Sequence, residues 1–138
     1  MPLMPKRVKY RKHHRGKNRG IATRGAALVS GEYGLKALNN GILTNMQIES
    51  VRVTLSRKLS AGGKLWIKVF PHKSFTKKPL ETRMGKGKGD LAGWVAVVQR
   101  GKVLFELGGI PEDYAKSIFR LVAYKIPIKT KFITRSHA

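Results

Sequence analysis

The sequence has no cysteine, few acidic residues and no long apolar run. Without cysteine, the chain can form neither disulfide bonds nor zinc sites with thiolate ligands. A metal-dependent nuclease needs clustered carboxylates to hold its ions. The seven acidic residues are instead scattered along the chain, at positions 32, 49, 81, 90, 106, 112 and 113. We therefore predict a protein that is not an enzyme and that has no metal site and no cofactor.

No apolar stretch approaches the roughly 18 residues that a membrane-spanning helix requires. The basic N-terminus is also not followed by an apolar segment like that of a signal peptide. The expected location is the cytoplasm, with no membrane partner.

Positive charge is what the chain has in excess. Lys and Arg number 29 and Asp and Glu number 7, so the formal charge is 29 − 7 = +22. Such a chain repels itself, and binding to a polyanion would relieve that repulsion. Nucleic acid is the usual polyanion, and an anionic membrane surface is the second candidate. The apolar fraction of 41% is nevertheless too high for a wholly disordered chain, so a core is expected.

Residues 1–25 form a distinct segment without any acidic residue, since the first acid in the chain is Glu32. Apolar residues are few here and show no period, which indicates an extended RNA-binding arm that is ordered only against a partner. A solvated, disordered tail is the alternative. The basic side chains expected to contact phosphates are Lys6, Arg7, Lys9, Arg11, Lys12, Arg15, Lys17, Arg19 and Arg24. The rings that could stack on exposed bases are Tyr10, His13 and His14; for Tyr10 a role as a small core anchor is equally open.

Residues 26–138 are predicted to form a single α+β domain, in which an antiparallel sheet or sandwich packs with two helices. Strands are expected at 32–38, 64–70, 93–98, 102–107 and 128–135. The strands 93–98 and 102–107 are predicted to form a hairpin through a turn at 99–101.

Both helices are predicted from apolar residues at helical spacing. The first begins at Thr44, where Gln47 completes the spacing of a capping box, and its apolar face is Ile48, Val51, Leu55 and Leu59. The second begins near Pro111, and its expected buried stripe is Ala115, Ile118, Leu121 and Val122.

The stretch RMGKGKG, residues 83–89, alternates glycine with basic residues. Glycine allows close approach to another backbone, and Arg83, Lys86 and Lys88 could each reach a phosphate. The spacing fits neither a P-loop nor a dinucleotide-binding fingerprint. We interpret the segment as a phosphate-binding glycine loop; a flexible hairpin connection that happens to be basic is the alternative. Met84 is expected to pack at the base of the loop, and the basic surface is expected to extend over Lys73, Lys77 and Lys78.

Five segments together carry a resemblance to a known family. They are PKRVKYRKHHRGKNRG at 5–20, YGLKA at 33–37, KLWIKVFPHK at 64–73, RMGKGKG followed by WVA within 83–96, and PIKTKFITR at 127–135. On these segments the chain resembles, over essentially its whole length, the bacterial large-subunit ribosomal protein family known as L-sixteen.

The resemblance implies an α+β sandwich with a long N-terminal extension. It also implies a ribosome-bound structural protein that binds the large ribosomal RNA near the peptidyl transferase centre, beside neighbouring large-subunit proteins. The glycine loop would point towards that centre and contact the aminoacyl-site tRNA, with peptidyl-site tRNA as a further candidate. The alternative function is a non-ribosomal RNA- or DNA-binding architectural protein, although no predicted helix has the basic face of a major-groove reader.

Overall fold

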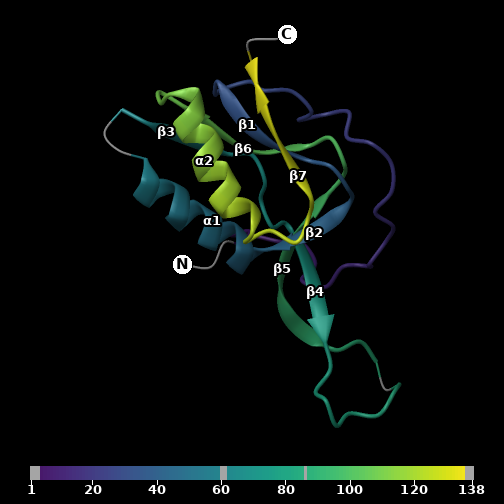
Figure 1. Cartoon of the computed structure of the whole chain (residues 1–138). Coiled ribbons are helices and arrows are strands. Elements are labelled where there is room, and N and C mark those ends of the chain that lie inside the picture. The colour runs from purple at the N-terminus through teal and green to yellow at the C-terminus, as the bar shows by residue number, and fades with distance from the viewer. Residues whose placement is uncertain (1–3, 60–61, 86, 136–138) are drawn as a thin grey trace.

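The computed structural model describes residues 4–59, 62–85 and 87–135, and it confirms the α+β class (Figure 1). Two antiparallel sheets are formed, one of four strands in the order β3-β6-β1-β7 and one of three in the order β2-β5-β4. The elements are β1 (Tyr33–Ala37), β2 (Gly41–Thr44), α1 (Asn45–Lys58), β3 (Lys64–Ile67), β4 (Lys73–Lys77), β5 (Asp90–Val98), β6 (Val103–Gly108), α2 (Glu112–Ala123) and β7 (Thr130–Thr134).

The core lies between the two helices and the sheets. Every residue of β6 is buried, as expected of a central strand covered on both faces, and Phe105 and Leu107 are fully enclosed. Helix α1 contributes Ile48, Val51 and Leu55 to this core, which confirms these three residues of the predicted apolar face; the fourth, Leu59, lies just past the end of the helix and is partly buried against the core. In Figure 1, α1 and α2 lie side by side.

The predicted capping box at the start of α1 is confirmed. The Gln47 amide donates to the Thr44 hydroxyl over 3.1 Å, and the Thr44 amide donates to the Gln47 side-chain oxygen over 3.0 Å. These two bonds satisfy amides that have no partner within the helix, and so they fix where α1 begins.

The buried stripe of α2 differs from the prediction at one position. Phe119 is buried and packs on Phe132, whereas Leu121 is 49% exposed. Ala115, Phe119 and Val122 follow the i, i+4, i+7 spacing of a single helix face, and Leu121 falls outside that face. Pro111 immediately precedes the helix, as predicted.

The predicted hairpin between 93–98 and 102–107 is wrong, because β5 and β6 belong to different sheets. Both neighbours of β5 are other strands, β2 and β4, while β6 lies between β3 and β1. The connecting turn pairs with the end of β1 instead. The Gly101 amide donates to Ala37 O over 2.7 Å, and the Ala37 amide donates to Lys102 O over 2.8 Å.

Two strands were not predicted. The segment 41–44 forms β2 by pairing with β5. The segment 73–77 forms β4 on the other side of β5. β4 and the longer β5 together extend away from the rest of the fold and carry the glycine loop at their far end (Figure 1).

Candidate nucleic-acid interface

Residues 4–25 of the basic arm run along the surface of the fold and form no helix or strand of their own (Figure 1). Its first attachment is the free edge of β4. The Ser74 amide donates to His13 Nδ1 over 3.1 Å, and the Ser74 hydroxyl donates to Arg11 O. The His13 ring also meets Trp94 edge-on, with ring centroids 6.2 Å apart. The arm thereby covers an edge strand that would otherwise present unpaired amides.

The second attachment lies where β2 begins and β5 ends. The Asn18 side-chain amide donates to Gly41 O and to Val98 O, each over 3.0 Å. The Asn40 side-chain amide in turn donates to Asn18 O over 3.2 Å. One asparagine of the arm therefore joins two strand ends of the three-stranded sheet.

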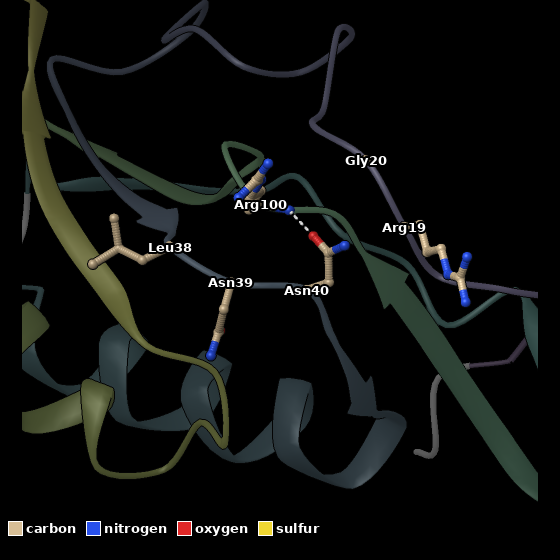
Figure 2. Close-up of a pocket in the computed structure, with 6 residues that line it drawn as sticks. All are labelled: Arg19, Gly20, Leu38, Asn39, Asn40 and Arg100. Carbon is tan, nitrogen blue, oxygen red and sulfur yellow. Dashed lines mark hydrogen bonds between the residues drawn. The ribbon is translucent and has the colours of Figure 1, made fainter.

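The third attachment lies at the turn between β5 and β6, beside a groove of about 340 Å³. Figure 2 shows Arg19 and Arg100 at this groove, with the Arg100 amide donating to the Asn40 side chain over 2.6 Å. Gln99 donates to Arg19 O over 2.8 Å, and the Ala22 amide donates to Arg100 O over 2.9 Å. Arg100 was not among the predicted binding residues, because its charge alone does not show that the arm passes beside it.

The predicted cations of the arm are exposed. This holds for Lys6, Arg7, Lys9, Arg11, Lys12, Arg15, Lys17, Arg19 and Arg24. Of the predicted stacking rings, His14 is exposed, Tyr10 is 67% exposed and His13 is half-buried against Trp94. The core-anchor alternative for Tyr10 is thus wrong. Its ring instead lies 5.7 Å from the ammonium of Lys9.

The glycine loop projects from the ends of β4 and β5, well clear of the sheets (Figure 1). Gly85 and Gly87 adopt φ values of 98° and 95°, which side-chain-bearing residues rarely adopt, and a Cβ at either position would meet only open space. Arg83 is exposed. Met84 is 97% exposed, so its predicted packing at the base of the loop is wrong. Lys86 lies outside the described residues.

Lysine side chains connect the loop and β4 to the arm. Lys88 donates through its ammonium to His13 O, and Lys73 donates to Arg15 O. Lys78 donates to Gly85 O over 2.6 Å within the loop, and Lys77 is exposed at the end of β4. Residues predicted from two distant parts of the sequence thus form one continuous basic surface.

Carboxylates do not neutralise this surface. Within the described residues, the two ion pairs are Arg52–Glu49 on α1 and Lys68–Glu106 in the four-stranded sheet, and neither includes the arm or the loop. On α1, the Arg52 guanidinium bonded to Glu49 lowers the pKa of that carboxyl.

Other kinds of site receive no support from the described part of the chain. No group of three His, Asp or Glu side chains there could hold a metal ion, and no helix there is long and apolar enough to cross a membrane. Trp94 is buried, and Trp66 is half-buried beside Gly108.

Comparison with known proteins matches residues 5–133 to the family model described as ribosomal protein L16p/L10e. Three similar proteins carry the name large ribosomal subunit protein uL16. The one from Fervidobacterium nodosum is 57% identical over 98% of this chain and 95% of its own length. The one from Lactobacillus acidophilus is 56% identical over 99% and 93%, respectively, and the one from Listeria monocytogenes serotype 4a is 53% identical over 96% and 92%.

Proposed function

The chain belongs to the ribosomal protein L16p/L10e family, and from this premise we propose that it is a structural protein of the large ribosomal subunit whose basic arm and glycine loop bind large-subunit RNA. In the proposal the protein binds large-subunit RNA near the peptidyl transferase centre, and the loop points towards that centre and contacts the aminoacyl-site tRNA. The chain carries out no chemistry itself, in keeping with a family of structural proteins.

The observation that supports RNA binding most directly is the surface formed by the arm and the loop. Lys88 joins the loop to the arm and Lys73 joins β4 to the arm, and within the described residues no carboxylate pairs with the arm or the loop. Uncompensated cations on an extended segment favour contact with phosphates, which contribute most of the affinity for RNA of this kind. Exposed Tyr10 and His14 add rings that could stack on unpaired bases.

The glycine loop supports a separate contact with tRNA. It projects away from the sheets, and Arg83 at its start can form two parallel hydrogen bonds with a phosphate. A protruding finger of this kind reaches a second RNA that does not lie on the body of the domain.

The RNA contact is tested by the salt dependence of binding to large-subunit RNA. If six or more phosphates are neutralised, affinity should fall by roughly 10³ or more between 50 and 200 mM salt. Changing Lys6, Lys12 and Lys17 together to Ala should reduce the slope of log affinity against log salt by about 2 to 3. The matched control changes three exposed cations of α2 and its C-terminal end, Lys116, Arg120 and Lys125, and should leave the slope nearly unchanged. A flat salt response in the native protein would contradict the proposal.

The tRNA contact is tested with Arg83, Lys86 and Lys88 changed together to Ala. Subunit assembly should survive, and tRNA accommodation should become slower. Lys88→Ala alone is the control, because Lys88 also holds His13 and its loss could act through the arm. Normal accommodation by ribosomes with the triple variant would exclude the loop from tRNA binding. Equal affinity for duplex DNA and for large-subunit RNA would favour the architectural alternative.

A further inference from the structure

The outer face of the three-stranded sheet exposes apolar side chains beside the arm. Ile42 of β2 is 50% exposed and pairs across the strands with Val97 of β5, which is half-buried. Phe75 of β4 is 40% exposed and pairs with Gly93 of β5. Because alternate residues of a strand share one face, these side chains lie on the face opposite buried Leu43 and Ala96.

Gly93 determines where the Phe75 ring lies. A Cβ at position 93 would be 2.8 Å from Cε1 and 3.0 Å from Cζ of that ring. These separations are shorter than van der Waals contact allows, so only glycine lets the ring lie over β5. The ring is thus held against the sheet while part of it remains accessible.

This face forms the floor of a cleft of about 700 Å³, whose rim includes residues 13 and 15–18 of the arm. Four cationic side chains line it, and no Asp or Glu does; the cations are Arg15, Lys17, Lys73 and Lys88. The ammonium groups of Lys73 and Lys88 each use one donor on an arm carbonyl and retain two others. The cleft therefore combines an apolar, partly aromatic floor with a positively charged rim.

We propose that this cleft binds one unpaired base of an RNA strand, with the base on Phe75 and its flanking phosphates on the cationic rim. The inference rests on the proposed RNA-binding function and adds a site at which RNA is held by stacking as well as by charge. A base is a flat ring with apolar faces, and the phosphates on either side of it carry negative charge. The cleft is complementary to this arrangement, because its floor is apolar and its rim is positively charged. Sheet surfaces with exposed aromatic rings bind single-stranded RNA bases in this way, and the volume is in the range of small-ligand sites.

The charge of the rim distinguishes this occupant from a protein segment. An apolar peptide would leave four ammonium and guanidinium groups without partners, and a second copy of this chain would bring further positive charge. A nucleotide can contact the apolar floor with its base and pair with the cationic rim through its phosphates.

The test uses the full chain and two ten-nucleotide probes of equal charge. One is an oligoadenylate with 2-aminopurine at its centre, and the other has abasic riboses throughout. Binding is followed by fluorescence anisotropy at 0.1 M salt. The native chain should bind the adenylate more tightly than the abasic strand, and it should quench the 2-aminopurine.

Phe75→Ala should weaken adenylate binding by about fivefold or more, because stacking of a base on an aromatic side chain contributes about that much or more. It should leave abasic binding nearly unchanged. Gly93→Ala should displace the ring and give a smaller loss in the same direction. The matched control is Tyr124→Ala, which removes an aromatic side chain that is 86% exposed and outside the cleft, and it should change neither probe. Circular dichroism melting verifies that each variant folds, and Phe75→Leu replaces Phe75→Ala if the latter does not.

The outcomes separate this inference from the RNA-binding function. Equal affinity for the two probes, unaltered by Phe75→Ala, would overturn the base site while salt-dependent binding still supported the proposed function. Absence of salt-dependent binding for both probes would contradict the proposed function as well. Self-association of the native chain that Phe75→Ala abolishes would show that a second copy occupies the face, and it would also overturn the inference.

Discussion

The carboxylate of Glu106 accepts a hydrogen bond of 2.8 Å from the backbone amide of Gly31, a residue 75 positions earlier in the chain. The same oxygen accepts from the amides of Ser30 and Val29, over 2.9 and 3.1 Å. Lys68 balances the buried charge, since its ammonium lies 3.6 Å from the other carboxylate oxygen. Glu106 thus anchors residues 29–31, which lie between the arm and β1.

Substitutions of Glu106 should destabilise the fold to an extent that depends on how many hydrogen-bond acceptors the new side chain keeps. Glu106→Ala leaves three amides without their acceptor and should lower the free energy of unfolding by about 3 kcal/mol or more. Glu106→Gln keeps one acceptor oxygen for the three amides but replaces the charged oxygen facing Lys68 with an NH2 group, so it should cost about 1–2 kcal/mol. Urea denaturation gives the free energies, and hydrogen exchange of residues 29–31 should accelerate more in the alanine variant. Equal losses in both variants would show that the amides do not depend on this acceptor.

Asn18 provides a second test of how the arm is attached, because both hydrogens of its side-chain amide point at strand carbonyls. Asn18→Ala should lower the free energy of unfolding by about 1–2 kcal/mol through loss of these two bonds. Asn18→Asp should cost more, since it places carboxylate oxygens against the carbonyls of Gly41 and Val98.

Salt must be controlled in this comparison, because the surrounding cations attract an added carboxylate. Unfolding is therefore measured at 1 M salt, where the Debye length is about 3 Å and that attraction is largely screened. An aspartate variant more stable than the alanine variant under these conditions would contradict the hydrogen-bond geometry.

The sequence predicts those parts of the fold that depend on local pattern. The start of α1 follows from Thr44 and Gln47, because a capping box is complete within four residues. Which strands pair with one another does not follow from local pattern. Nothing in the composition of 93–98 or 102–107 indicates that β5 and β6 enter different sheets, because pairing depends on contacts with β1 and β2 far away in the chain.

In the candidate interface, too, the local features could be predicted from the sequence and the long-range contacts could not. Excess charge identifies the arm and the loop, since cations without nearby acids are visible in the sequence. Their contact through Lys88 and His13 is not visible there, because the two residues are 75 positions apart. β4 was missed for a related reason. Its residues are mostly polar, and it is stabilised by pairing with β5 and by the arm bound at Ser74.

Alanine substitutions at Met84 and at Phe105 should change the free energy of unfolding by very different amounts. Met84 is 97% exposed on the glycine loop, so Met84→Ala should change the free energy of unfolding by no more than about 0.5 kcal/mol. Phe105 is fully buried in β6, and Phe105→Ala should lower it by about 3–5 kcal/mol. Thermal or urea denaturation measures both. A large loss from Met84→Ala would restore the packing role that its exposure now excludes.

The glycine loop makes a final prediction, because its glycines have different surroundings. At Gly87, φ is 95° and a Cβ would meet open space. At Gly89, φ lies outside the left-handed region, but a Cβ would be 2.9 Å from the backbone C and O of Lys77. Gly87→Ala should therefore cost about 1 kcal/mol of local backbone strain that an open loop can relax. Gly89→Ala should push apart the two strands that support the loop.

Amide chemical shifts and hydrogen exchange distinguish these effects. In Gly87→Ala the changes should remain within the loop. In Gly89→Ala they should extend to Lys77 and Asp90, which pair at the ends of β4 and β5. Since the reach of the loop depends on this support, tRNA accommodation should be slowed more by Gly89→Ala than by Gly87→Ala. Undisturbed pairing of Lys77 with Asp90 in Gly89→Ala would mean that the close approach at this position does not hold the loop.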